Sequence, residues 1–172
     1  KGFEEIILNA FKEKQDAFLI SFQAMNTDGN YFKKYSNKAY QHTFRTVLKI
    51  STIEIAINLK KVGKPKLFDE KFGPGSICIC GSDTVFVTDA IKQGKLMYYV
   101  PQAIVVHPPI SSGRDYNEKI VYHKGIMYRR CFGLLAFILD LVFAIKKYDD
   151  YRHRLGFFKF LFLMWKGSLK SV

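Results

Sequence analysis

The sequence predicts an α/β domain followed by a basic helical extension, and three observations support this fold class. Segments with helical periodicity alternate with short β-branched and aromatic runs over residues 1–110. Residues 111–172 contain two apolar stretches separated by a polar, basic run. The chain has 172 residues, of which 48% are hydrophobic and 24% charged, which allows a packed core and excludes a disordered chain. We place the boundary between domain and extension in the loop-forming residues Pro108–Arg114.

The first half of the predicted domain contains a helix, a strand and a second helix. Gly2–Lys14 has apolar residues at helical spacing, which predicts an amphipathic helix. Asp16–Phe22 is rich in strand formers, and the polar residues of Asn26–Asn30 predict a turn after it. Ser51–Lys60 is expected to be helical, because its first residue and Glu54 have the spacing of a capping box.

The second half of the predicted domain contains a loop, a helix and strands. Lys66–Ser76 is predicted to be a tightly turned loop, since two glycines flank a proline within it. Ser82–Gln93 predicts a helix, with Gly94 in the position that follows its C-terminus. The β-branched and aromatic runs Leu96–Val100 and Ala103–His107 predict one or two strands around a proline. The helix residues expected to face inward are Val85, Phe86, Ala90 and Ile91.

The extension is expected to be helical, with apolar runs too short to cross a membrane. Within the largely helical Asn117–Lys147, the run Cys131–Ile145 carries a single charge, at Asp140. As a helix this run spans about 22 Å at ~1.5 Å per residue, less than a hydrocarbon core of about 30 Å. Leu155–Trp165 is shorter and combines aromatic residues with lysines, as interfacial helices do. We expect it to contact a membrane surface, and packing onto the domain or onto a second copy of the chain is the alternative. The residues assigned to this membrane or partner surface are Phe157, Phe158, Lys159, Phe162 and Trp165.

The formal net charge of +12 predicts an anionic partner. Residues 111–172 hold 12 Lys and Arg against 5 Asp and Glu, so the extension alone carries +7. The chain contains no RNP-type motif, zinc finger or recognisable helix-turn-helix, and we expect no nucleic acid as partner. Because the charge is densest where the apolar helices are expected, we favour an anionic membrane surface.

The cysteines predict neither a disulfide framework nor a zinc site. Three Cys are too few for a disulfide scaffold, and their number is odd, which is typical of a reducing compartment. Cys78 and Cys80 lie two apart in an extended run, but no second Cys pair completes a set of zinc ligands. We interpret them as structural thiols.

Two residues are candidates for chemistry, and each has a structural alternative. Asp83 lies where a loop enters a predicted helix, a place suited to a general base at the mouth of a cleft. The alternative is that its carboxylate only complements the helix dipole. His107 ends a predicted strand, and a neutral imidazole binds divalent metals well. Its alternative is a hydrogen-bonded structural residue.

An ordered series of motifs from Lys1 to Pro108 resembles the C-terminal, acceptor-side portion of a family 2 glycosyltransferase with the GT-A fold. The resemblance implies a partial GT-A, Rossmann-like domain over residues 1–110. The series consists of Asp16-Ala17, Ser21-Phe22, Ile50-Ser51, Phe68-Asp69-Glu70-Lys71-Phe72-Gly73, Gly81-Ser82-Asp83-Thr84-Val85-Phe86, Asp89, Gly94, Tyr99-Val100-Pro101 and Val105-Val106-His107.

The resemblance also implies roles for individual residues. Asp83 matches the family's catalytic base, and Ser82 stands where the family has a second acidic residue. His107 matches a ligand of the divalent metal, Mn²⁺ or Mg²⁺. The residues that match the loop lining the acceptor side are Phe72, Gly73, Gly75, Ser76 and Ser82.

The implied reaction transfers a sugar from a nucleotide-sugar to an acceptor hydroxyl with inversion, in cell-surface glycan synthesis. Its partners are the donor and a glycan or lipid-linked glycan acceptor. We expect the basic, apolar extension to hold the protein at the cytoplasmic face of the membrane, as a peripheral protein. The family's Asp-x-Asp motif precedes the segment where this chain begins, and the Gln-x-x-Arg-Trp motif of processive synthases is absent. The chain has neither an initiator Met nor a signal-peptide pattern at Lys1, so we expect a fragment of a longer protein. Without the Asp-x-Asp motif we expect this fragment to be inactive alone, and without the Gln-x-x-Arg-Trp motif we expect a single-addition transferase. The main alternative is a non-catalytic docking module derived from the same domain.

Overall fold

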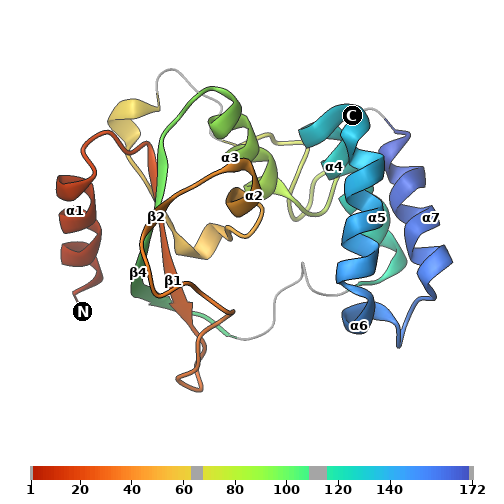
Figure 1. Cartoon of the computed structure of the whole chain (residues 1–172), viewed down its shortest axis with the longest axis horizontal. Helices are drawn as coiled ribbons and strands as arrows, with labels where there is room; N and C mark the ends of the chain where they lie inside the picture. The colour runs from red at the N-terminus through yellow and green to blue at the C-terminus, as the bar shows by residue number, and fades with distance from the viewer. Residues whose placement is uncertain (1, 63–67, 109–115, 171–172) are drawn as a thin grey trace. The chain divides into compact units, whose positions relative to one another are not determined.

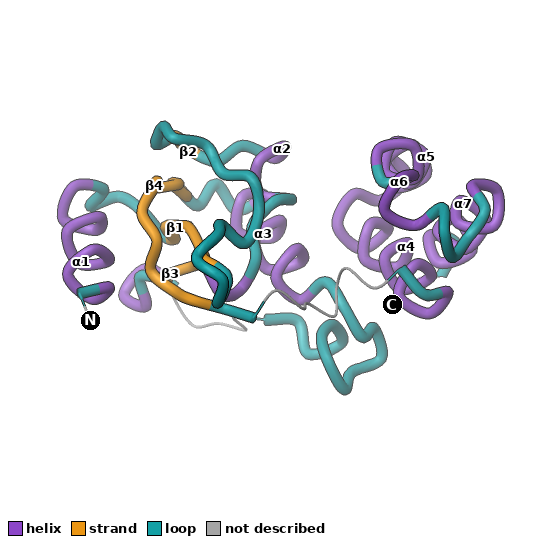
Figure 2. The backbone as a smooth tube through the Cα atoms, turned by 90° about the horizontal axis from the view of Figure 1, so that it is seen from below, coloured by secondary structure: helices purple, strands orange, loops and turns teal. Residues whose placement is uncertain are grey.

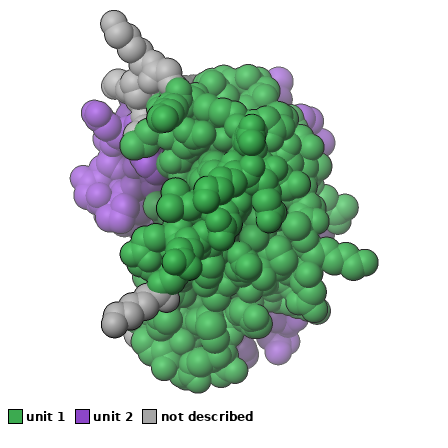
Figure 3. All heavy atoms as spheres, turned by 90° about the vertical axis from the view of Figure 1, so that its left-hand side faces the viewer, with its two compact units in different colours: residues 1–67, 86–110 green, residues 68–85, 111–172 purple. Residues whose placement is uncertain are grey.

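The computed structural model describes residues 2–62, 68–108 and 116–170. The fold is α/β, as the sequence predicts. The chain forms two compact units, which are coloured separately in Figure 3. Unit 1 consists of Lys1–Leu67 and Phe86–Ile110, and unit 2 of Phe68–Val85 and Ser111–Val172. The stretch 68–85 is therefore grouped with the C-terminal helices, although the sequence indicates a boundary only near Pro108–Arg114, where Pro108 alone is described.

Unit 1 is built on a mixed four-stranded sheet with the order β2-β4-β1-β3. The strands are β1 (Leu19–Met25), β2 (Tyr40–Gln41), β3 (Ile55–Ile57) and β4 (Met97–Val106). β1 runs parallel to β4 and antiparallel to β3, and β4 runs antiparallel to β2. The predicted strand at 16–22 is confirmed in its second half and continues three residues further.

The amphipathic helix predicted at the start of the chain is α1 (Phe3–Glu13), and it covers one face of this sheet (Figures 1 and 2). Side chains alternate between the faces of a strand, so Ile20 and Phe22 point toward α1. Ser21 and Gln23 point to the other face, where buried polar groups gather. The strand thus separates an apolar layer from a polar one.

The prediction of a helix over Ser51–Lys60 is wrong. The capping box between Ser51 and Glu54 exists, but it starts only a 3₁₀ turn, η1 (Thr52–Glu54). The chain then extends into β3, pairs with β1, and forms a second 3₁₀ turn, η2 (Leu59–Lys61). Tertiary pairing with a buried strand therefore outweighs the local helix signal.

The two runs around Pro101 form one strand, β4, with a proline inside it. Proline has no N–H to donate, so it is expected only where a ladder is interrupted. The register between β1 and β4 shifts between Ser21 and Gln23, opposite this proline, and β2 reaches β4 only at Tyr98 and Tyr99. Pro101 therefore lies where neither neighbour needs its N–H.

Helix α3 (Ser82–Lys92) confirms the prediction for Ser82–Gln93. Val85, Phe86 and Ala90 are buried, as expected, and Ile91 is partly buried. Gly94 has φ +71° and donates its N–H to Ile91 O, while Lys95 N–H bonds Ala90 O. This pair of bonds is a Schellman motif, so Gly94 ends the helix as predicted.

Unit 2 is a set of packed helices joined by short connections (Figures 1 and 2). The break at Gly133, which has φ +59°, separates α4 (Glu118–Phe132) from α5 (Ala136–Lys146) by a short 3₁₀ turn. None of the helices in the described ranges is long and apolar enough to cross a membrane. The helices are α4 (Glu118–Phe132), α5 (Ala136–Lys146), α6 (Tyr148–Tyr151) and α7 (Phe157–Ser168).

Aromatic rings and glycines make the core of these helices. Tyr151 stacks on Phe160 with ring centroids 3.7 Å apart, and Tyr116 packs edge-on against both rings. Helices α4 and α7 approach so closely that a Cβ at Gly125 would overlap the backbone carbonyl of Met164. Gly167 is equally confined, by the backbone of α4. The two helices therefore meet backbone to backbone, as only glycines permit.

Candidate functional site

Asp83 occupies the first turn of α3, directly after a sharp bend of the chain. Gly81 makes this bend with φ +93°, a conformation that favours glycine. The Asp83 carboxylate accepts the N–H of Thr84 at 2.8 Å and is only partly buried. The bond uses an N–H of the first helical turn, and Asp83 stays partly open to solvent.

The glycine-rich loop before α3 is tightly turned, as predicted. Gly73 and Gly75 both have positive φ, at +124° and +83°. Gly73 N–H donates to Cys78 O at 2.7 Å, and Cys78 N–H donates to Lys71 O at 2.9 Å. The hydroxyl of Ser76 lies 2.7 Å from Gly73 O and closes the turn. The loop is therefore held by its own backbone.

This loop and the start of α3 lie against each other. A Cβ at Gly73 would be 3.5 Å from Ser82 Oγ, so no atom separates the two chain segments there. Ser82 immediately precedes Asp83 in the same helical turn. The structure therefore brings together Gly73, Ser82 and Asp83, all three of which the sequence predicts as site residues.

Phe72 has a different place from the one that the sequence suggests. Its side chain is buried in an apolar cluster with Cys78, Val85, Met127 and Cys131. It therefore anchors the loop and does not line an open surface. Cys78 fills the same cluster as a free thiol, and burial raises its pKa, in agreement with the interpretation as a structural residue.

Helix α4 contacts the loop through residues that the sequence does not reveal as its partners. The imidazole Nδ1 of His123 accepts the N–H of Ile79 at 3.1 Å. Arg130 pairs with Asp69 at 3.4 Å. Met127 fills the space beside Gly81, where a Cβ would overlap its side chain. The loop and α4 are more than 40 residues apart in sequence, so no local signal could have indicated these partners.

Lys124 adds a basic side chain to this region, which its own place in the sequence does not predict. Burial lowers the pKa of Lys124, while the nearby side chains of Cys80 and Asp83 oppose that shift. Its ammonium also lies 5.7 Å from the centre of the Phe143 ring, within cation–π range. Lys124 is therefore a basic neighbour of Asp83 whose charged form is disfavoured by burial.

His107 lies in unit 1, directly after β4, where its N–H donates to Met25 O at 2.8 Å. Its Nδ1 is 2.7 Å from Pro108 O, and a carbonyl can only accept, so Nδ1 carries the proton. The lone pair of Nε2 is then available to a metal, which makes His107 suitable as one ligand. Within residues 2–62, 68–108 and 116–170, no group of three or more His, Cys, Asp or Glu could hold a metal ion. Of the metal ligands that the resemblance implies, the described residues therefore supply one suitable ligand, His107.

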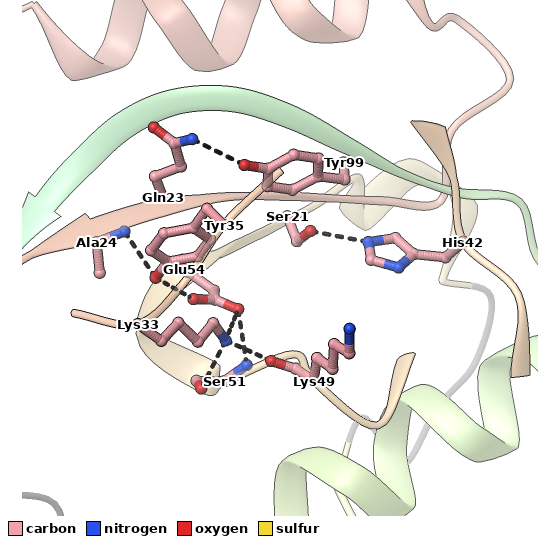
Figure 4. A network of polar contacts seen from close by, with 10 residues as sticks. All are labelled: Ser21, Gln23, Ala24, Lys33, Tyr35, His42, Lys49, Ser51, Glu54 and Tyr99. Carbon is pink, nitrogen blue, oxygen red and sulfur yellow. Dashed lines mark hydrogen bonds and ion pairs between the residues drawn. The ribbon is translucent and has the colours of Figure 1, made fainter. Parts of the chain in front are cut away.

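Unit 1 contains a second cluster of interest, a buried polar network centred on Glu54 (Figure 4). The Glu54 side chain is 3% exposed, and Lys33 Nζ lies 2.6 Å from its carboxylate. Tyr35 donates its hydroxyl to Glu54 at 2.8 Å, and Ser51 donates its N–H at 3.0 Å. Lys33 also donates to the carbonyl of Lys49. The network links residues within the irregular segment between β1 and β3. Both carboxylate oxygens of Glu54 have hydrogen-bond partners.

Two further pairs extend the network onto the sheet. Ser21 Oγ lies 2.8 Å from Nε2 of His42, and Gln23 donates to the Tyr99 hydroxyl at 2.8 Å. Burial, aided by the charge of Lys33, lowers the pKa of His42 to about 4, so this imidazole is neutral at physiological pH. The Tyr99 ring stacks on Tyr40 with centroids 4.8 Å apart. Because its groups bond one another, we interpret this network as structural support.

The chain matches no known protein family, no curated protein and no solved structure.

Proposed function

We propose that this chain is the acceptor-side part of an inverting, metal-dependent family 2 glycosyltransferase, in which Asp83 is the general base. The observation that carries the proposal is the contact between the glycine-rich loop and the first turn of α3. It places Ser82, the residue before the partly exposed Asp83, against a turn that is held by its own backbone hydrogen bonds. An acceptor hydroxyl that reaches this turn would find a base within the same surface.

The roles of the neighbouring residues follow from their contacts. Asp83 takes the proton of the acceptor hydroxyl while the oxygen of that hydroxyl attacks the anomeric carbon of the donor. Phe72 and α4 keep the loop in place, and Lys124 is a buried basic neighbour of Asp83. A divalent metal would neutralise the diphosphate leaving group, and His107 is the described residue suited to ligate it.

The test is sugar-nucleotide turnover by an intact protein that contains this chain, with Mn²⁺ or Mg²⁺ and a panel of donors. We expect Asp83→Asn to lower kcat by about 100-fold or more, because a positioned base contributes ~10²–10⁴-fold. The matched control is Asp149→Asn, the same chemical change at an exposed carboxylate of unit 2, which should keep full activity. Turnover that survives Asp83→Asn would assign the base to another residue.

The second candidate is a non-catalytic docking module that retains the shape of such a domain. The observation that favours it is the amount of apolar surface exposed on α5 and α7. The same substitution separates the candidates, since a docking module would bind its partner equally well with Asn at position 83. Metal-dependent release of nucleoside diphosphate, lost in Asp83→Asn, would exclude it.

A further inference from the structure

Helix α5 and the turn before it expose one continuous apolar stripe. Its members recur at helical spacing of three and four residues, which places them on one side of the helix. The opposite side is buried and holds Ala136, Asp140 and Ala144. Solvent-exposed fractions of 74% for Leu134 and 62% for Ile138 are unusual for such large apolar side chains in a packed unit. The stripe consists of Leu134, Leu135, Ile138, Val142 and Ile145.

Helix α7 exposes a second apolar stripe, and it faces away from the core of unit 2. Phe158 is 84% exposed and Phe162 is 62% exposed. Phe157, which the sequence grouped with them, packs partly inward against the aromatic core. The stripe consists of Phe158, Phe162, Trp165 and Leu169.

The two stripes join at Trp165. Its indole N–H donates to the backbone carbonyl of Phe137 at 3.1 Å, so the end of α7 lies beside the start of α5. Leu141, one turn further along α5, is partly exposed on the same side. We call the two stripes together the α5–α7 face. Figures 1 and 2 both show the two helices side by side.

Lysines border this face on one side. Lys159, Lys166 and Lys170 recur along α7 at seven and four residues, which places them in one row next to the apolar stripe. All three are exposed, and Lys159 pairs with Glu118 at 2.5 Å. Lys146 is exposed near the corresponding edge of α5. The arrangement is an apolar face with cations along its rim.

We propose that the α5–α7 face binds the surface of a membrane that contains anionic lipid, with both helices lying in the plane of the interface. Apolar side chains enter the boundary between headgroups and acyl chains, and lysines at the rim meet the lipid phosphates. Trp165 then lies at the level where indole rings concentrate in membrane proteins. The proposal is independent of the transferase activity, since it needs only these helices.

Charge decides between a membrane and a second copy of the chain as the occupant. Residues 111–172 carry a net charge of +7. Two copies that met through this face would bring their cationic rims together, and like charges oppose association. An anionic lipid surface complements the same rim. The charge therefore favours lipid.

The test uses the full chain with vesicles of neutral phosphatidylcholine alone, or mixed with anionic phosphatidylglycerol. Trp165 is the only Trp in the sequence, so its fluorescence reports on this face. We expect a blue shift of its emission and co-sedimentation with the anionic vesicles, both reduced by added salt. Equal binding to the two kinds of vesicle, or binding to neither, would overturn the proposal.

Variants separate the apolar and the electrostatic contributions. Phe158→Ser with Phe162→Ser should lower partitioning into anionic vesicles at least about tenfold, since each ring loses buried area. Lys166→Gln with Lys170→Gln should lower it by about tenfold as well and flatten its salt dependence. Leu59→Ser is the control, because Leu59 is 70% exposed in unit 1 and should leave binding unchanged.

A second copy as occupant makes a different prediction. The blue shift would then grow with protein concentration in the absence of lipid, and sedimentation would show a dimer that Phe158→Ser with Phe162→Ser dissociates. That result without vesicle binding would overturn the membrane proposal in favour of self-association. A Leu59→Ser variant that bound as weakly as the double Phe variant would also overturn it, because the α5–α7 face would then have no special role.

Discussion

The two units bury their polar groups in opposite ways. In unit 1, the carboxylate of Glu54 accepts from Lys33, Tyr35 and the backbone of Ser51, so its buried charge is compensated. In unit 2, Asp140 is fully buried and bonds only Ser168, at 2.6 Å, while its other carboxylate oxygen has no partner in the described part of the chain. Unit 1 satisfies its irregular segments with a polar network, whereas unit 2 relies on rings and close helix contacts.

This difference shows that the two units depend on different terms of the folding free energy. A buried network of hydrogen bonds is sensitive to the loss of one partner, because the remaining groups stay buried without compensation. A helix pair in backbone contact is sensitive to added volume. Substitutions chosen for one mechanism should therefore affect one unit and leave the other intact.

The largest effect is expected from Gly125→Ala in unit 2. The added methyl group would overlap the backbone of Met164, whose carbonyl carbon would lie 2.8 Å away, so α4 and α7 must separate. We expect a loss of about 4 kcal/mol of unfolding free energy, although alanine is intrinsically the better helix former. Urea denaturation followed by Trp165 fluorescence measures this unit.

Gly156→Ala is the matched control for that substitution. Gly156 lies at the start of α7 with φ −67°, and a Cβ there would meet nothing within 4 Å. A loss of less than about 1 kcal/mol is expected. Equal stability of the Gly125→Ala and Gly156→Ala proteins would contradict the backbone contact between α4 and α7.

The next largest effect is expected from Glu54→Gln in unit 1. The amide keeps the size of the side chain but removes the charge that pairs with Lys33 and one of the two acceptor oxygens. We expect a loss of about 3 kcal/mol, as when a buried pair loses one partner. Hydrogen exchange of the β1 and β4 amides measures this unit, and Glu13→Gln, at an exposed position of α1, should have no effect. Unchanged protection in Glu54→Gln would mean that the network adds nothing to stability.

The pH dependence should have opposite signs in the two units. Burial raises the pKa of Asp140 to about 6 from 3.8, and the Ser168 hydrogen bond only partly opposes it. The folded state then binds the proton more tightly, so unit 2 loses stability as pH rises from about 4 to 6. The pKa of His42 falls to about 4 from 6.5, so the unfolded chain binds that proton more tightly. Unit 1 therefore gains stability as pH rises from about 4 to 6.5.

Each of these changes in unfolding free energy is expected to amount to about 2 kcal/mol over its pH range, after allowance for solvent screening. Denaturation across this pH range, with Trp165 fluorescence for unit 2 and hydrogen exchange for unit 1, checks both signs. Asp140→Asn should flatten the profile of unit 2 alone, and His42→Asn that of unit 1 alone. Parallel profiles for the two units would show that other groups dominate.

The smallest effect is expected from Lys159→Gln. The pair that Lys159 forms with Glu118 is as short as the Lys33–Glu54 pair, at 2.5 Å, but both of its side chains are 57% exposed. Water screens such a pair, so its loss should cost about 0.5 kcal/mol or less. The comparison with Glu54→Gln in the same denaturation assay tests whether burial, and not distance, determines how much an ion pair contributes to the unfolding free energy. A loss as large as that of Glu54→Gln would contradict this interpretation.

The parts of the fold that the sequence predicts are those with local causes. Helix α3 and its termination at Gly94 follow from helical spacing and the freedom of glycine, and the turns at Gly73 and Gly75 follow from the same property. The strand β3 was missed because Ser51 and Glu54 do form a capping box, and only the pairing with β1 decides that the chain extends after it. Local signals were correct there, and the long-range contact outweighed them.

The candidate site shows the same difference between local features, which the sequence predicts, and long-range contacts, which it does not. The loop, Ser82 and Asp83 are near neighbours in sequence, so their proximity could be expected from it. The supports on α4, His123, Lys124 and Met127, could not, because nothing in their own surroundings distinguishes them from other residues on a helix. The roles of Asp83 as base and of His107 as metal ligand stay predictions.

The course of the chain through the two units has a consequence for synthesis on the ribosome. The chain passes from unit 1 to unit 2 after residue 67, returns after residue 85, and leaves again after residue 110. The strand β4, which joins β1 to β2, is made only after the glycine-rich loop. The edge of β1 that pairs with β4 therefore stays without its hydrogen-bond partners until about residue 106 has emerged. The loop itself stays without its support until α4 follows. A truncated gene product that ends before β4 would lack both β4 and α4, so both units would be incomplete, and we expect it to engage chaperones.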